Sequence, residues 1–328
     1  ERGYASLHAA CMLKAFLLGR LVSVRVGQWA SEFASVLATV PAGRSVYSST
    51  GFSCSVTCGR VSFALGLHGP CASYDTACSA SLVATHGNVR SLQRLECEAA
   101  LSAGVNLILD PAQMLGHAIA GFTSAMGRCH TFDVRADGYA RGDAIDSLTC
   151  RLVGGPAGDH RAHLLGSAVR QDGRSASLTA PNGQAQKSLL NTSFSDAQLN
   201  VEGALVLEAH GTGTALGDPI ETGAFSAVFL SAQNGRSDPF AIGSLKANTG
   251  HTEPGAGLAG LVKLHVQLVQ SFAMPPNAQL RVVNPHVHRA LGALASLQTQ
   301  AGKTASCMST GGVSSFGYSG TIAHAALQ

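Results

Sequence analysis

Apolar residues follow two periodicities along the chain, one typical of strands and one typical of helices. In the first half, helical spacing predicts a helix at residues 4–19. Residues 51–69 instead combine turn residues with apolar positions that alternate at Val61, Phe63 and Leu65. The other elements predicted here are a strand at 22–26, a short strand at 73–76, a helix at 80–95 and a strand at 99–109.

The second half repeats this alternation of strand and helix. A polar, glycine-rich stretch at 127–142 predicts a long loop, and a weak break follows near residues 154–159. Beyond it, the pattern predicts strands at 164–169, 204–208 and 240–242, and helices at 185–190, from Asp218 onward and at 256–270. The alternation predicts an α/β fold, divided into residues 1–158 and 159–328.

The composition is that of a globular chain and excludes several classes of partner. Of the 328 residues, 45% are hydrophobic and 12% are charged, which allows a large buried core. The net charge of +3 comes from 22 basic and 19 acidic residues without a basic run, so neither nucleic acid nor an anionic membrane is indicated. Nine scattered cysteines without a CxxC pair indicate reduced thiols and a reducing compartment.

No apolar run reaches the length that spans a membrane, because Lys14, Arg20 and Arg25 interrupt the most hydrophobic stretch. The chain is therefore expected to be soluble. It begins at Glu1 without an initiator Met, so a targeting peptide or upstream domain would lie outside this sequence. Localisation stays open between the cytoplasm and a plastid.

The first candidate for chemistry is the segment DTACSAS, a strand-to-helix turn with Cys78 at its bend. A thiol at a helix N-terminus lies near unpaired N–H groups and the positive end of the helix dipole, which lower its pKa and favour the thiolate. Nucleophile elbows use the same geometry. From Cys78 alone, a buried inert cysteine is the commoner explanation.

The second candidate is His210 in EAHGTGT, directly after an apolar strand. The glycines of this loop let a substrate approach the backbone, and the hydroxyls of Thr212 and Thr214 can bond a polar chain. A histidine that is satisfied by its own loop explains the pattern equally well.

The third candidate is His251 in SLKANTGHTE, between a predicted strand and a helix. Lys246 and Glu253 in this segment could orient His251 or tune its pKa, and each could equally be an ordinary solvated charge. The fourth segment, GGVSSFGYSGTIAH at 311–324, has the glycines of a tight loop.

Two other pairs of histidines have spacings that also occur among metal ligands: His160 with His163, and His286 with His288. No cluster of Cys or carboxylates completes a site beside either pair. We therefore expect no metal in this chain.

Taken together, the four segments resemble the β-ketoacyl synthase family, in particular the ketosynthase domains of modular polyketide synthases. The family motif DTACSSS appears as DTACSAS, EAHGTGT is intact, SxKSNIGHxE appears as SLKANTGHTE, and GVSSFGFGGTNAH appears as GVSSFGYSGTIAH. Residues 104–109 and 132–142 also resemble family segments, so the resemblance extends over nearly the whole chain. It implies a thiolase-like fold of two related halves in five αβαβα layers, with the nucleophile in 1–158 and both catalytic histidines in 159–328.

The resemblance also implies a role for each matching residue. Cys78 would be acylated, while His210 and His251 would hold the thioester carbonyl of a malonyl-type extender and Lys246 would support His251. The implied contacts to substrate come from Thr212 and Thr214 on pantetheine, from the Cys78 and Tyr318 N–H groups as an oxyanion hole, and from Phe316 and Glu253.

The reaction implied is a decarboxylative Claisen condensation in polyketide or fatty acid synthesis, with the motifs favouring polyketides. It needs no metal and no organic cofactor, because the substrates are carried on the phosphopantetheine of an acyl carrier protein. The expected partners are that carrier protein, a second copy of the chain in a homodimer and other domains of a polyketide synthase.

The chain also departs from the family pattern. The N-terminal glycine-rich strand, its loops and a helix have no counterpart, so we expect part of the first core to be missing. Either the chain is a fragment of a larger protein, or it folds with an exposed edge and impaired stability. Ile322 replaces an Asn and Ser319 replaces a Gly in the loop of Tyr318, which puts the oxyanion hole in question. Asp146 and Thr149 occupy an otherwise apolar strand, where we expect weaker packing.

Three rival functions remain to be weighed. A non-catalytic partner or acyl-binding subunit of a synthase complex would explain the missing N-terminal elements and Ile322, although all three catalytic positions are present. A degradative thiolase does not account for HGTGT, or for a histidine where a thiolase has its second cysteine. A cysteine protease explains neither HGTGT nor two histidines.

Overall fold

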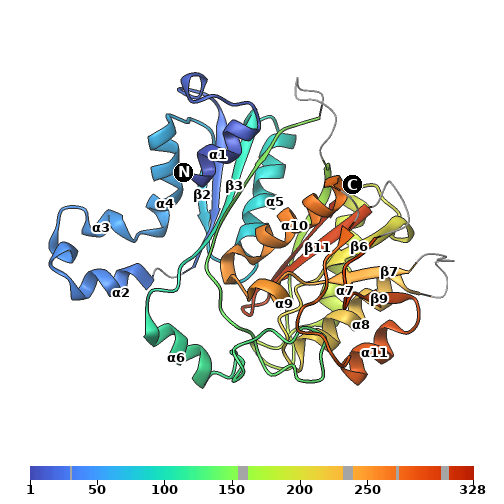
Figure 1. The fold of residues 1–328 in the computed structure, drawn as a ribbon. Coiled ribbons are helices and arrows are strands. Elements are labelled where there is room, and N and C mark those ends of the chain that lie inside the picture. The colour runs from blue at the N-terminus through green and yellow to red at the C-terminus, as the bar shows by residue number, and fades with distance from the viewer. Residues whose placement is uncertain (30–31, 154–161, 232–238, 271–272, 304–309) are drawn as a thin grey trace. The chain divides into compact units, whose positions relative to one another are not determined.

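The computed structural model describes residues 1–29, 32–153, 162–231, 239–270, 273–303 and 310–328. The chain, drawn in Figure 1, divides into two compact units, and each unit is built from stretches that are not contiguous in the sequence. The first unit comprises Glu1–His117, Gly142–Asp159 and Thr252–Leu258, and the second comprises Ala118–Arg141, His160–His251 and Ala259–Gln328. Strands and helices occur in both units, as the α/β prediction requires.

The first unit contains a four-stranded sheet in the order β2-β1-β3-β4. Strand β1 is parallel to β2 and β3, and β4 is antiparallel to β3. The strands are β1 Val22–Gly27, β2 Cys71–Tyr74, β3 Ala99–Asn106 and β4 Ala144–Cys150, and the helices are α1 Arg2–Ala9, α2 Glu32–Thr39, α3 Ser48–Gly51, α4 Cys54–Leu65, α5 Ala80–Gln93 and α6 Pro111–Ile119. The predictions at 22–26, 80–95 and 99–109 are confirmed, with β3 ending earlier and β2 lying two residues before its predicted position.

The helix predicted at 4–19 is wrong beyond Ala9. Cys11 adopts a left-handed conformation with φ 60°, and a short 3₁₀ turn follows at Lys14–Phe16. This break brings Leu7, Met12 and Leu17 into one core, which residues five apart on a continuous helix would not share.

The alternation that we interpreted at 51–69 is also wrong, because this stretch forms helix α4. Phe63 is 90% exposed, whereas Cys58 and the partly buried Val61 and Leu65 lie on the face that packs on β1. Their spacing of three and four residues is the helical one. Gly66, with φ 68°, ends the helix in the left-handed conformation that glycine adopts readily.

The second unit contains a six-stranded sheet in the order β5-β12-β11-β6-β7-β9, of which β11, β6, β7 and β9 are labelled in Figure 1. Strand β6 is parallel to β7 and β11, while β12 is antiparallel to both of its neighbours. The strands are β5 Leu164–Gln171, β6 Ala204–Glu208, β7 Phe240–Gly243, β9 Ala295–Leu297, β11 Thr310–Phe316 and β12 Thr321–Leu327, and a separate pair joins β8 Ala273–Met274 to β10 Gly302–Lys303.

Helices accompany this sheet in the second unit. They are α7 Gly183–Asp196, α8 Gly217–Phe229, α9 Lys246–Thr249, α10 Ala256–Gln270, whose first turn belongs to the first unit, and α11 Pro285–Leu291. The core between α7, α8 and the sheet is aromatic, with Phe194, Phe225, Phe229 and Phe240 almost fully buried. Helix α7 extends beyond its predicted bounds at both ends, and at its N-terminus the side chain of Asn182 caps it by accepting the N–H groups of Gln184 and Ala185.

The segment 311–324, predicted as a loop, is mostly a hairpin. Strands β11 and β12 pair through six residues from Gly311 to Phe316, and only residues 317–320 form the turn. Within the described ranges, none of the helices combines the length and apolar character that crossing a bilayer requires.

Candidate active site

Cys78 lies on a sharp bend between β2 and α5 in the first unit. Ala77, immediately before it, has φ 52°, a left-handed conformation that is uncommon for alanine. The Asp75 carboxylate accepts the Ala77 N–H at 3.2 Å, and the Ser79 hydroxyl donates to the Thr76 carbonyl at 2.9 Å. These bonds hold the sulfur at the start of a 14-residue helix, as the elbow prediction requires.

Two glycines let the start of α5 approach the sheet closely. A Cβ at Gly27 would lie 2.2 Å from the Ser81 nitrogen, and one at Gly104 would lie 3.0 Å from the Ser81 Cβ. The Ser81 hydroxyl oxygen in turn accepts the Leu258 N–H at 3.0 Å. The position of Cys78 therefore depends on backbone packing that no larger residue would permit.

His210 lies two residues beyond β6, in the second unit. Its N–H and that of Gly211 donate to the two oxygens of Glu221 at 2.7 and 2.8 Å. Gly211 has φ 44°, and a Cβ there would lie 2.7 Å from the Cβ of Ser244. The carboxylate of Glu221 thus holds this loop, and only glycine fits at position 211.

The protonation of His210 follows from its contacts. Its Nδ1 accepts the Phe316 N–H at 3.3 Å, so a neutral ring carries its hydrogen on Nε2. Burial, together with the charges of Lys246 and His251, holds the pKa of His210 well below its ordinary value of 6.5. The ring is therefore neutral at physiological pH and presents Nε2–H as a donor.

His251 packs directly against His210. The two ring centroids lie 5.6 Å apart at an interplanar angle of 87°, and Tyr139 lies edge-on at 4.8 Å on His251. The His251 N–H donates to the Ala140 carbonyl at 2.7 Å, and the residue is fully buried. Lys246, 5% exposed, opens the short helix α9 that leads to this loop. The second unit thus brings together His210, His251 and Lys246.

Two acids of α8 hold this arrangement, and we assigned them no role from the sequence. Asp218 accepts the N–H groups of Phe132 and Gly213 at 2.7 and 3.1 Å. Burial raises the pKa of Asp218 to about 6 and also raises that of Glu221, which lies near Asp218. The signal available in the sequence was GDPIE, directly after HGTGT.

The other predicted binding residues of the second unit lie around the same loops. The Thr212 and Thr214 hydroxyl oxygens are 3.3 Å apart, and Thr214 accepts the Gly217 N–H. The Phe316 ring lies 5.4 Å from that of His210. Tyr318 is 45% exposed in the turn of the hairpin, with its ring 5.7 Å from Phe122.

Glu253 has a different setting, because it belongs to the first unit and is 1% exposed. Its Oε2 accepts the Asn106 side-chain N–H at 3.0 Å, and its Oε1 lies 3.4 Å from His117 Nδ1. Asn106 also donates to the Gly142 carbonyl. The carboxylate of Glu253 therefore serves to join β3, α6 and the segment at Gly142.

The two departures near Tyr318 differ in their surroundings. Ile322 is fully buried against Phe316, Leu189 and Ala168, so an apolar side chain is suited to this position. Ser319 is exposed. In β4, one carboxylate oxygen of Asp146 is buried without a hydrogen-bond partner in the described structure, and burial raises its pKa to about 6.

Of the two histidine pairs that we weighed as metal ligands, only one lies wholly within the described residues. His160 lies outside the described residues, and His286 and His288 lie on α11. In the described part of the chain, no group of three or more His, Cys, Asp or Glu side chains is arranged so that it could hold a metal ion.

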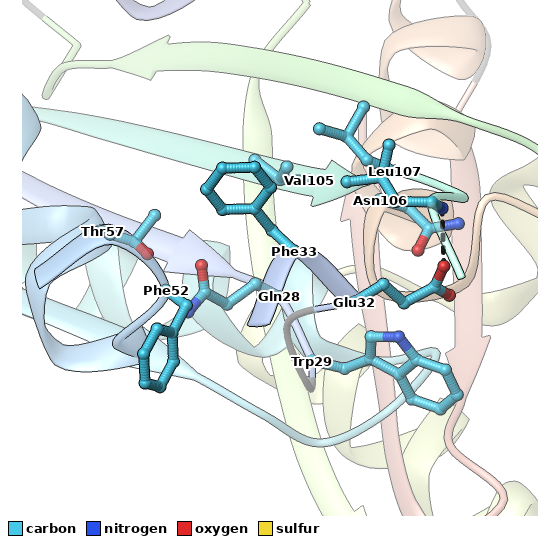
Figure 2. A pocket seen from close by; sticks show the side chains of 11 residues that line it. Gln28, Trp29, Glu32, Phe33, Phe52, Thr57, Val105, Asn106 and Leu107 are labelled. Atoms are coloured by element: carbon cyan, nitrogen blue, oxygen red, sulfur yellow. Dashed lines mark hydrogen bonds between the residues drawn. The ribbon is translucent and has the colours of Figure 1, made fainter. Parts of the chain in front are cut away.

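The first unit also contains a cavity of about 120 Å³ beyond the carboxyl ends of β1 and β3 (Figure 2). Open α/β sheets commonly bind ligands at such strand ends. Its wall includes Trp29, Phe33 and Phe52, and Gln28, whose N–H donates to the Tyr74 carbonyl at the end of β2. The cavity is therefore connected through the backbone to the strand that leads to Cys78.

Comparison with known proteins gives one consistent result. Residues 4–146 match the family model of the β-ketoacyl synthase N-terminal domain, and residues 161–281 match that of the C-terminal domain. A phenolphthiocerol/phthiocerol polyketide synthase of Mycobacterium tuberculosis is 41% identical over 290 residues, which are 86% of this chain and 15% of that protein. The highly reducing polyketide synthase frbB of Dothideomycetidae sp. is 36% identical over 333 residues, 100% of this chain and 12% of that protein.

Solved structures agree with these relatives. The ketosynthase from module 6 of the bacillaene synthase of Bacillus subtilis superposes with a TM-score of 0.89 at 31% identity, over 99% of this chain and 56% of that one. The oxazolomycin ketosynthase domain OzmH KS7 of Streptomyces albus gives a TM-score of 0.85 at 28% identity, over 100% and 59%. This chain thus spans a small part of its curated relatives.

Proposed function

Because the chain belongs to the β-ketoacyl synthase family of acyl-transferring condensing enzymes, we propose that it catalyses decarboxylative condensation of an acyl thioester with a malonyl-type extender. The predicted thiolase-like fold is confirmed by its structural relatives. The observation that carries the proposal is the neutral His210, which presents Nε2–H beside His251 and Lys246.

In the first step, the Cys78 thiolate attacks the carbonyl carbon of an acyl thioester and releases the carrier thiol. We assign the stabilisation of the resulting oxyanion to hydrogen bonds from the N–H groups of Cys78 and Tyr318. Each such donor typically lowers the barrier by roughly 3 kcal/mol. The elbow at Ala77 supports this assignment, because it places the buried Cys78 directly before the start of a helix.

In the second step, the malonyl thioester loses carbon dioxide, and the electrons of the broken bond form an enolate. His210 and His251 donate hydrogen bonds to the enolate oxygen, and a nearby Lys246 cation favours the negative charge. A neutral His210 suits this role, since a donor that keeps its proton stabilises the enolate without protonating its carbon. The enolate carbon then attacks the thioester of Cys78 and expels the thiolate.

The proposed partners follow from this chemistry. An acyl carrier protein presents both substrates on phosphopantetheine, which Thr212 and Thr214 contact, and further polyketide synthase domains act on the product. We place a second copy of the chain along β2, which is an edge strand of the described sheet and would leave unpaired backbone groups exposed. The acyl chain would end in the cavity beside Trp29.

The test uses one acyl thioester and one malonyl thioester. Intact mass and peptide mapping should find one acyl group on Cys78, absent from Cys78→Ala, while carbon dioxide release from the malonyl thioester should be lost in His210→Ala. Retention of decarboxylation in Cys78→Ala would separate the two steps. A folded chain on which Cys78 is not acylated and which releases no carbon dioxide would instead be a non-catalytic partner or an acyl-binding subunit of a synthase complex.

A further inference from the structure

Glu208 and Lys263 form a buried ion pair next to the loop of His210 in the second unit. Glu208 is the last residue of β6, two residues before His210, and is 2% exposed. Its Oε2 pairs with Nζ of Lys263 on α10, and its Oε1 accepts the Leu245 N–H at 2.6 Å. Leu245 immediately precedes Lys246, so one carboxylate joins both segments of the site.

Two glycines pack closely against the side chains of Glu208 and Lys263. A Cβ on Gly260 of α10 would lie 3.0 Å from the Cγ of Glu208, and a Cβ on Gly243 would lie 3.2 Å from Nζ of Lys263. Glycine at both positions leaves the space that the two long side chains occupy.

The segment before Lys246 depends on such side-chain contacts for its position. The Ser244 N–H donates to the Asn277 amide oxygen at 2.9 Å, and the Ser244 hydroxyl donates to the Gly211 carbonyl at 3.1 Å. Helix α9 has four residues, too few to fix its own N-terminus. The bond from the Leu245 N–H to Glu208 therefore fixes the backbone immediately before Lys246.

We propose that Glu208 is a positioning residue that holds the Leu245 N–H and thereby sets Lys246 beside His210 and His251. Lys263 balances the charge of the buried carboxylate, which would otherwise be strongly destabilising. This inference rests on the proposed function for its catalytic readout, and it predicts a specific defect in decarboxylation rather than in acylation of Cys78.

Two double variants of the full chain isolate the bond to Leu245. E208Q/K263M removes both charges but keeps an oxygen that can accept the Leu245 N–H, whereas E208M/K263M removes the charges and the acceptor. Each variant leaves one buried donor without its partner, the introduced side-chain amide in the first and the Leu245 N–H in the second. The two variants should therefore have similar stability, which thermal unfolding checks.

We expect carbon dioxide release from a malonyl thioester to fall at least thirtyfold in E208M/K263M and no more than fivefold in E208Q/K263M. Acylation of Cys78 should be equal in both. If the two variants decarboxylate at the same rate, or lose acylation in parallel, Glu208 has only a structural role and the proposal is overturned.

A substrate-free measurement separates this inference from the proposed function. Lys246 lowers the pKa of His210, so its displacement should raise that pKa. NMR titration of histidine-labelled protein should give a higher pKa for His210 in E208M/K263M than in E208Q/K263M. Equal titrations would refute the positioning role, even in a chain without condensing activity, and a difference would support it.

Discussion

His324 provides the most direct test of how the second unit is packed. It lies on β12, fully buried, with its Nδ1 2.9 Å from the Ser314 hydroxyl and its ring 6.0 Å from that of Phe194. In the described structure its Nε2 is buried without a hydrogen-bond partner. Burial lowers the pKa of His324 from 6.5 to about 3, so the native state keeps this ring neutral.

The magnitude follows from this pKa. One pKa unit corresponds to about 1.4 kcal/mol, so protonating His324 in the native state would cost at most about 5 kcal/mol. The unfolded chain takes up the proton as the pH falls through 6.5, so the stabilising contribution is complete above that pH and is lost progressively toward pH 3. Between pH 7 and pH 5, His324 should lower the free energy of unfolding by about 2 kcal/mol.

The assay is urea unfolding of the wild type and His324→Gln at pH 7, 6 and 5. The variant should be less stable at pH 7, because it loses packing, but its stability should decrease by about 2 kcal/mol less between pH 7 and pH 5. His68→Gln, which replaces an exposed histidine, should follow the wild type. Parallel curves for His324→Gln and the wild type would mean that the ring is not held neutral, and would refute the reasoning.

Further predictions concern the site and its supports. Asp146→Asn should raise the free energy of unfolding by about 1–2 kcal/mol at pH 8 and leave it unchanged at pH 3. Burial raises the Asp146 pKa to about 6, so the cost of burying an ionised carboxylate is complete only above that pH, and partial solvation of the site limits the increase. Gly27→Ala should destabilise the chain by about 1–3 kcal/mol in urea unfolding and slow Cys78 acylation at least about tenfold, since its Cβ would lie 2.2 Å from the Ser81 nitrogen; normal acylation would show that α5 is free to shift. Decarboxylation should stay constant between pH 8 and pH 6, because the pKa of His210 lies well below 6.5, and a midpoint near 6.5 would contradict its neutral assignment. Trp29→Ala should enlarge the cavity and shift acyl preference toward longer chains in competition assays, and an unchanged preference would place the acyl chain elsewhere.

Sequence reasoning succeeded where one buried face determined the pattern. Strand β6 was predicted with its observed bounds, because four apolar residues precede Glu208 and a glycine-rich turn follows it. It failed at α4, where a strand-like alternation and a helical repeat share the same letters and only the exposure of Phe63 distinguishes them. The hairpin of β11 and β12 was missed because its glycines, which indicate a loop, serve close packing instead: a Cβ at Gly312 would lie 2.5 Å from Nε2 of His324.

The motifs identified which residues belong to the site but could not give their chemical state. The tautomer of His210 is set by the N–H of Phe316, which is 106 residues away in the sequence. The role of Glu253 depends in the same way on Asn106 and His117, from two other elements. Contacts of this kind arise only when the chain has folded, so no local pattern encodes them.

Three buried carboxylates hold the backbone of the loops around His210 by accepting N–H groups. They explain why the motif EAHGTGT begins with an acid and is followed by GDPIE. Glu208, Asp218 and Glu221 each accept backbone N–H groups from the loops that carry His210 or Lys246. Loops of this kind have few hydrogen bonds of their own. A carboxylate can accept an N–H group on each of its two oxygens, and its charge strengthens both bonds. The segment from Glu208 to Glu221 therefore acts as one unit, in which the acids hold the backbone that carries the imidazole of His210.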